Sequence, residues 1–526
     1  MHMWPTWFMR GDLFCFVWRN LSLKSHRTEY SYSIHLSQLS FSSRPRICIS
    51  VFNLMHRALR IPEIMQEISW HTDRSSLPGL ALTCRTFKGP ALDALWRNFP
   101  FLEPFVSCLP THIWGFKLVK PIDTIAWDTF RKYASRVRSI TQSKDPSFIL
   151  EHLRMLMLAY PYPPSTMFLN LRSLTWNANQ IHLAIEFLRM ALVPSLVSLD
   201  LRITSISPVL KSILSNIGTT CPNLTYFYFR PQMDDPKLNR DFAPVLTHVI
   251  CQLKKLSALT ICHLEDPGMK HVTQLKSLKT FWLYVAPTFL RRTGLSPQSL
   301  GFEHLDYLSL RAPRLHHITD FLCYLRTVQT KHFTAALSTV FGQQSDSMSG
   351  FCGMLLERCD KDALETIKLC EQLYNTFDII FAQPSDFSPL RLFHNLTHFD
   401  IETACTLSIS DDELSELVNP RPKLKIFRLS CYHHPESTAL PTFHGLINVL
   451  RLCPELPDGI DVASPGNGIR NDGLQELVLG NSLISSPLVV ALVLSDLFPN
   501  LAEVNLAPWF GGPLHSLFCQ PREMEQ

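Results

Sequence analysis

One recurring pattern constrains this chain of 526 residues more than any other feature: L-x-x-L-x-L, with conservative replacements, repeats along most of its length. Most copies begin 22 to 32 residues apart. The copies begin at Leu171, Leu196, Leu224, Leu256, Leu278, Leu305, Leu364, Leu396, Leu424, Leu474 and Leu501, and Val137 with Ile140 is a degenerate first copy. Alternate side chains of a strand point to the same face, so each copy predicts a short strand with one buried face.

The segments between the copies predict turns and helices. Proline lies two residues before several predicted strands, at Pro194, Pro222, Pro422, Pro454 and Pro499, where it ends a helix and begins a strand. Residues 410–418 predict a helix in which Ser410 and Glu413 have capping-box spacing. One repeat cannot bury its apolar face alone, so the copies must stack.

We therefore predict an α/β fold in which residues 137–510 form a curved solenoid, with parallel strands inside and helices outside. The spacing resembles that of leucine-rich repeats, and an ordinary α/β domain with leucine-rich strands is the alternative. The copies are farther apart where residues 343–347 and 462–473 predict loops, and Leu456 opens a degenerate copy.

The block from residue 55 to 100 has three short groups of apolar residues at helical spacing. Residues 73–76 offer a helix start between the first two groups, and Lys88-Gly89-Pro90 breaks the pattern before the third. Three helices of about ten residues have too small a core to be stable alone. Such a block should leave apolar surface for a partner.

This block resembles an F-box. The matching segments are Ile61-Pro62-Glu63-Ile64, Ile68 with Asp73, Leu82-Thr83-Cys84-Arg85, and Leu95-Trp96-Arg97; Ile61, Ser69, Thr72 and Thr83 depart from the usual residues. The resemblance implies docking to an SKP-type adaptor and, through it, to a cullin-RING ubiquitin ligase. The positions that it assigns to adaptor binding are Ile61, Pro62, Ile64, Ile68, Leu80, Cys84 and Trp96. The alternative is a helical subdomain packed on the rest of the chain.

The remaining segments have other compositions. Residues 1–54 hold six Lys and Arg against two acidic residues, and so account for the net charge of +4. We expect them to be a disordered leader or an upstream extension of the reading frame. We also expect a helical connector at residues 101–136, in which Trp127, Phe130 and Tyr133 share a face, and a disordered tail at 511–526.

Charge and cysteine usage limit the partners and the compartment. The balanced charge of the rest of the chain argues against nucleic-acid binding. Fifteen cysteines without a repeated short spacing indicate reduced thiols, and hence a cytoplasmic or nuclear protein. The longest apolar run, residues 488–494, is too short for a membrane helix.

Fragments that suggest enzyme or metal chemistry are weak. Gly466-Asn467-Gly468 lacks the third glycine of a dinucleotide loop, and neither Cys431 with His433 and His434 nor Cys352 with Cys359 has zinc-site spacing. We therefore expect no cofactor, no metal and no catalytic residue.

The residues between the leucines are the candidates for substrate binding, because they face away from the buried side of each strand. Aromatic and charged side chains at these positions are typical of binding sites. They are Tyr226, Tyr228, Trp282, Tyr307, Asp400 and Arg428.

The combination of an F-box with degenerate leucine-rich repeats looks like the substrate receptors of SCF-type ubiquitin ligases, in which the repeats bind the substrate protein. A repeat scaffold that recruits no ligase is the second hypothesis. An enzyme with an unrecognised site is the third.

Overall fold

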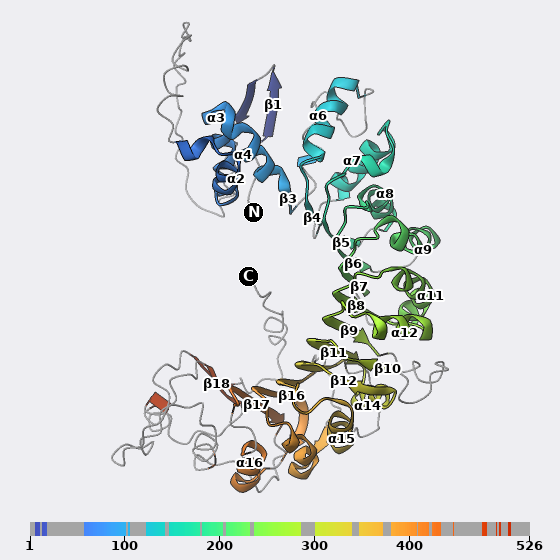
Figure 1. Cartoon of the computed structure of the whole chain (residues 1–526), viewed down its shortest axis with the longest axis vertical. Coiled ribbons are helices and arrows are strands. Elements are labelled where there is room, and N and C mark those ends of the chain that lie inside the picture. The colour runs from blue at the N-terminus through green and yellow to red at the C-terminus, as the bar shows by residue number, and fades with distance from the viewer. Residues whose placement is uncertain are drawn as a thin grey trace, which may run out of the picture. The chain divides into compact units, whose positions relative to one another are not determined.

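The structure is a computed structural model and comprises two compact units, Met1–Ile213 and Leu214–Gln526, whose boundary falls inside one helix. In each unit the helices that connect successive parallel strands lie on one side of those strands (Figure 1). The residues that the structure describes are 6–10, 13–17, 57–100, 104–105, 122–142, 147–178, 181–203, 207–231, 236–285, 300–338, 347–371, 380–407, 409–419, 423–432, 445, 476–480, 491, 494–495 and 503–506.

The first unit contains the expected three-helix block. After a 3-10 turn at Arg57–Arg60, the helices are α2 (Pro62–Trp70), α3 (Leu77–Thr83) and α4 (Arg85–Arg97). Pro62 lies in the first turn of α2, where a missing N–H does no harm. One expectation was wrong: Lys88-Gly89-Pro90 does not interrupt the helix, because α4 begins at Arg85 and runs through Pro90.

Tertiary contacts explain why α4 tolerates a proline. Its buried side chains extend on both sides of Pro90, from Phe87 to Trp96. Arg136 donates to the carbonyl oxygen of Gly89 at 3.3 Å and also pairs with Asp93. A proline inside a helix removes one backbone hydrogen bond, and these contacts offset that loss.

The helical block continues directly into the sheet. β3 (Asn98–Phe99) follows α4 and pairs in parallel with β4 (Ser139–Gln142), and α6 (Thr124–Ala134) lies between them in sequence. Asp123 caps α6 by accepting from the amide of Ala126 at 2.7 Å. The expected connector helix therefore belongs to a strand–helix–strand repeat of the sheet itself.

Parallel pairing continues through the rest of the first unit. β4 pairs with β5 (Ser173–Ala178), and β5 pairs with β6 (Ser198–Ile203). The helices between and after these strands are α7 (Ser147–Leu158), a 3-10 turn at Pro164–Thr166, α8 (Ile181–Ala191) and α9 (Pro208–Ser215). Phe99, Ile140, Leu174 and Leu199 are in register and buried.

The second unit repeats the same arrangement. Its principal strands are β7 (Tyr226–Pro231), β8 (Ala258–Ile261), β9 (Thr280–Tyr284), β11 (Tyr307–Ala312), β13 (His332–Leu337), β14 (Thr366–Glu371), β16 (His398–Leu407) and β17 (Ile426–Tyr432). Each pairs in parallel with the next in this order. The order in the sheet thus follows the order in the sequence, as stacked repeats require.

Helices alternate with these strands. They are α10 (Ile217–Thr220), α11 (Pro236–Gln252), α12 (Asp266–Gln274), α14 (Leu315–Cys323), α15 (Met348–Arg358), the 3-10 helix η4 (Pro384–Leu392) and α16 (Asp411–Val418). Additional strands are β15 (Ile380–Ala382), which pairs with β16, and two separate parallel pairs, β10 (Leu300–Phe302) with β12 (Leu325–Val328) and β18 (Glu476–Gly480) with β19 (Glu503–Leu506).

All eleven full copies of the pattern coincide with a strand, which confirms the prediction of an α/β fold with parallel strands joined by helices. The sequence pattern missed β13 in the gap after β11. There, Thr330 and Ala335 occupy two of the three leucine positions and only Phe333 is large. Thr330 is nevertheless buried, because its hydroxyl donates to the backbone near β11 and β13.

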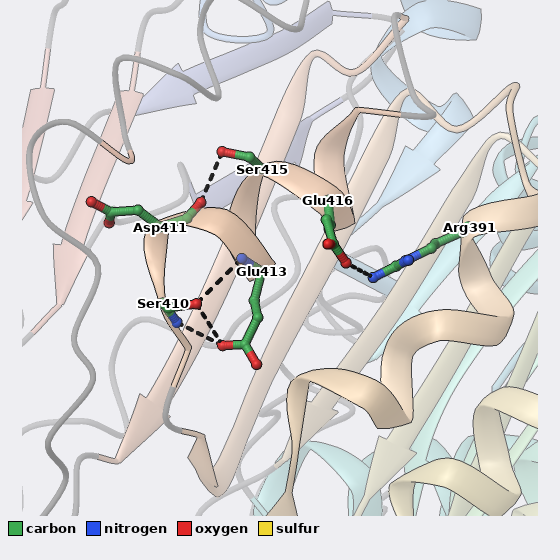
Figure 2. Close-up of polar contacts among 6 residues, drawn as sticks. All are labelled: Arg391, Ser410, Asp411, Glu413, Ser415 and Glu416. Atoms are coloured by element: carbon green, nitrogen blue, oxygen red, sulfur yellow. Dashed lines mark hydrogen bonds and ion pairs between the residues drawn. The ribbon is translucent and has the colours of Figure 1, made fainter.

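The predicted capping box of α16 is present (Figure 2). The Ser410 hydroxyl accepts from the Glu413 amide at 3.3 Å, and the Glu413 carboxylate accepts from the Ser410 amide at 2.9 Å. Arg391 of η4 pairs with Glu416 of α16 at 2.5 Å. The helix therefore begins where the sequence predicts.

Several predictions concern the two ends of the chain and stay predictions. In the leader, β1 (Thr6–Arg10) and β2 (Leu13–Val17) form an antiparallel hairpin that pairs with no other strand that the structure describes. Leu456, Gly466 and the 511–526 tail lie outside the described residues. Among the helices described, none is long and apolar enough to span a membrane.

Candidate binding faces

The outward positions of the second unit's strands form two rows in register, which together we call the sheet face. The inward side chains of the same strands are buried, from Phe227 of β7 to Phe399 of β16. The first outward row, in register, is Tyr226, Ala258, Thr280, Tyr307, His332, Thr366, His398 and Ile426; the second is Tyr228, Thr260, Trp282, Ser309, Thr334, Lys368, Asp400 and Arg428. All six residues predicted for substrate binding lie in these rows.

Two of the predicted aromatic residues form a stacked pair. The rings of Trp282 and Tyr307 are 5.4 Å apart and inclined by 17°. The Tyr307 hydroxyl lies 2.9 Å from the hydroxyl of Thr334 on the next strand, and burial raises the pKa of Tyr307. Trp282 remains 37% exposed. An exposed indole held in one orientation by its neighbours is suited to contact a partner without further loss of rotamer freedom.

The other two aromatic residues are farther away. Tyr226, 44% exposed, and Tyr228 lie on β7, and β8 separates them from Trp282 with the small residues Ala258 and Thr260. Two strand spacings correspond to about 10 Å. The predicted group of four rings is therefore a stacked pair and a separate tyrosine pair on one face.

The charged end of the sheet face is built around Asp400. This side chain is buried, and its Oδ2 accepts from Lys368 Nζ at 2.9 Å and lies 3.6 Å from Arg428 Nη1. The three residues occupy equivalent positions on β14, β16 and β17. Asp400 and Arg428 were predicted from the repeat pattern, whereas Lys368 was missed although it lies between Ile367 and Leu369 in the same pattern.

Two histidines on the first outward row were also missed. His332 Nδ1 lies 2.9 Å from the Thr366 hydroxyl, and His398 Nδ1 lies 2.8 Å from the Thr397 hydroxyl. Burial lowers the pKa of His398, and the nearby His332 and Lys425 lower it further. The outward register of β13 would have revealed His332 if that strand had been recognised.

The predicted adaptor-binding residues separate into three groups by exposure. Ile61, Pro62, Ile64 and Ile68 are exposed, at 45% for Ile61 and 37% for each of the other two isoleucines. Ile64 and Ile68 line a shallow depression with Glu63, Glu67, His71 and Thr72. Met65 and Ser69 of the same helix are buried, so α2 has an inner face and an exposed apolar face.

Trp96 does not belong to that exposed face. It is buried and stacks on Tyr133 of α6 at 4.6 Å between ring centroids, and Phe99 and Phe105 lie 5.2 and 6.3 Å away. Its position at the end of α4 directs it into the core that joins the helical block to the sheet. Leu80 and Cys84 are half-buried.

The described residues hold no group of three or more His, Cys, Asp or Glu arranged to bind a metal. Cys352 and Cys359 are buried thiols, and burial raises the pKa of Cys359 to about 12. His433 and His434 lie outside the described residues.

Neither a protein-family model nor a curated protein sequence matches the chain. Among solved structures, the chain is similar to the leucine-rich repeat-containing protein LegL7 from Legionella pneumophila, with 13% identity and a TM-score of 0.26. That similarity covers 64% of this chain and 88% of LegL7. At this level the similarity carries no conclusion, and the repeat architecture described above depends on strand order and register alone.

Proposed function

We propose that this protein is a substrate-recognition adaptor of an SCF-type ubiquitin ligase in the cytoplasm or nucleus. Its α2–α4 block is an F-box that docks an SKP-type adaptor, and its sheet face binds the substrate protein. Other subunits of the ligase transfer ubiquitin, so the chain needs no catalytic residue or cofactor. Neither a membrane nor nucleic acid is a partner in this proposal.

The observation that carries the proposal is the exposed apolar face of α2. Ile61, Ile64 and Ile68 recur at helical spacing and are more than a third exposed, whereas the intervening Met65 is buried. Burying the part of each isoleucine that is still exposed contributes about 0.6–1.3 kcal/mol, which is the corresponding share of the value for a fully exposed side chain. Two such side chains on α2 and a third at its N-cap provide the apolar centre of a docking site.

The packing behind this face supports the same function. Trp96 fixes α4 against α6, and β3 then joins the sheet. Because α2 belongs to the same compact unit as the first repeats, an adaptor docked on α2 is held in a fixed position relative to those repeats. A flexible linker between α2 and the repeats would leave that position variable.

The experiment is co-purification of the full chain with the SKP-type adaptor. In the variant Ile64→Asp/Ile68→Asp, two carboxylates would be buried without partners, at several kcal/mol each, and we expect co-purification to be lost. The matched control is Ile125→Asp/Leu158→Asp, which makes the same change at two exposed positions of α6 and α7 in the same unit. Binding by the α2 variant equal to that of the control would refute the F-box assignment.

The second candidate is a repeat scaffold that binds proteins without recruiting a ligase. The regular outward rows of the second unit favour a protein-binding face whatever the helical block does. Absence of co-purification between the wild-type chain and any SKP-type adaptor would favour this candidate over the first.

A further inference from the structure

The sheet face differs in chemistry from one end to the other. Its aromatic end contains the Trp282–Tyr307 stack, and its charged end contains Lys368 and Arg428 on either side of Asp400. With the third outward position of each strand included, cations outnumber carboxylates. The cations are Arg230, Arg311, Lys368 and Arg428, and the carboxylates are Asp400 and Glu402.

Because Asp400 is buried, the excess of positive charge is larger among the exposed groups of the sheet face. Asp400 is 6% exposed and lies beneath the two cations that contact it. Lys368 and Arg428 retain 35% and 26% of their side-chain exposure. A partner at this end therefore meets two positive groups above one buried negative group, and a negatively charged partner is favoured.

The register fixes the distance between the two ends. Trp282 is in register with Ser309, Ser309 with Thr334, and Thr334 with Lys368, which makes three strand spacings. Three spacings correspond to about 14 Å, the length of roughly four residues of extended peptide. Ser309 and Thr334 are buried and small, so neither side chain obstructs a peptide that extends from the aromatic end to the charged end.

We propose that the sheet face takes an extended acidic peptide segment of the substrate. An aromatic or large apolar side chain of that segment lies against Trp282, and an Asp or Glu about four residues away lies against Lys368 and Arg428. This inference deepens the proposed function, because it states what kind of substrate segment the sheet face takes. It does not depend on the α2 face.

The test uses the full chain and an array of synthetic peptides, each with one Trp and one Glu at increasing separation in a neutral background. Binding is measured by fluorescence anisotropy. The expected result is a maximum at a separation of about four residues, with weaker binding when Glu is replaced by Gln and weakest when it is replaced by Lys. Raising the salt concentration from about 0.05 to about 0.5 M should weaken the Glu peptide far more than the Gln peptide.

Two variants locate the binding. Trp282→Ala should weaken the best peptide about thirtyfold, as loss of a central aromatic contact does, whereas Leu392→Ala, an exposed residue of η4, should not. Lys368→Met should remove the preference for Glu over Gln, whereas Lys276→Gln, exposed in the segment between α12 and β9, should keep it. The salt dependence of the wild-type chain remains decisive if Lys368→Met does not fold.

Several results would overturn the inference. These are binding that does not depend on Glu or on its separation from Trp, a preference for the Lys peptide, and no binding of any peptide in the array. Stronger binding of a single-stranded oligonucleotide than of the peptides would also overturn it, because stacked rings and cations serve that ligand too. Each of these results leaves co-purification with the SKP-type adaptor unaffected, so failure here is distinguishable from failure of the F-box assignment.

Discussion

Replacing Trp96 by alanine should destabilise α2–α4, α6 and β4 together. Trp96 is 5% exposed, and its indole is in contact with Tyr133, Phe99 and Phe105. Truncation of a buried tryptophan to alanine typically costs about 3–5 kcal/mol, because the transfer free energy is lost and a cavity remains. For a loss of about 3 kcal/mol, the equilibrium constant for local unfolding of the region packed around Trp96 rises by more than a hundredfold.

Hydrogen exchange of the full chain, followed by mass spectrometry of its peptides, measures this effect region by region. The expected result is a joint increase in exchange in α2–α4, in α6 and in β4, since Trp96 is the packing link between them. Peptides from the second unit should exchange at the wild-type rate. A single denaturation midpoint would be less informative, because a chain with two compact units need not unfold in one step.

Trp70 provides a matched control in the same block. It is 42% exposed, and the guanidinium of Arg97 lies 4.4 Å from the centroid of its ring. Trp70→Ala removes an exposed cation–π contact, which contributes about 0.5–1 kcal/mol. Two results would refute the reasoning: an effect of Trp96→Ala confined to α4, or equal effects of the two substitutions.

Four further predictions concern other parts of the chain. Asp400→Asn should lower the stability of the second unit by about 2–3 kcal/mol in the same exchange assay, because two partly exposed cations lose their buried carboxylate; unchanged protection of β16 would contradict this. Ser410→Ala should destabilise α16 by about 1 kcal/mol by removing its cap, whereas Ser415→Ala, within the helix, should have little effect. The lowered pKa of His398 means that the unfolded chain binds more protons just below about pH 6.5, so the stability of the second unit should fall as the pH decreases through that range. His398→Gln should flatten this decline, and both are read from the exchange protection of β16 at each pH, corrected for the intrinsic exchange rate. Deleting residues 1–54 should change neither the melting temperature nor adaptor binding, and a loss of several degrees would show that this segment stabilises the fold.

The strands of this protein were predictable because the same side chains that define the sequence pattern also form the buried row of the sheet. Phe281 and Leu308 are in register and fully buried, as the pattern requires. The pattern failed at β13, where the buried hydroxyl of Thr330 takes the place of a leucine through backbone hydrogen bonds. Composition does not reveal such a replacement, because it depends on neighbours that only the fold supplies.

The candidate sites were predictable only in part, for a related reason. Strand alternation predicts which side chains face outward, and so it found Trp282 and Arg428. Strand alternation does not predict how deeply a side chain is buried. The burial of Asp400 beneath two cations, one of which is Lys368, was therefore not predicted. Family resemblance likewise assigned Trp96 to a docking surface, whereas packing against α6 places it in the core.

The most direct test of the proposed function is hydrogen exchange of the wild-type chain with and without a purified SKP-type adaptor. We predict that the adaptor slows exchange in α2 and at the exposed end of α3, and that the strands of the sheet face exchange as before. The sheet face would then remain available to a substrate. Absence of any change in α2, or protection located on the strands from β7 to β17, would contradict the proposal that this chain is a ligase adaptor.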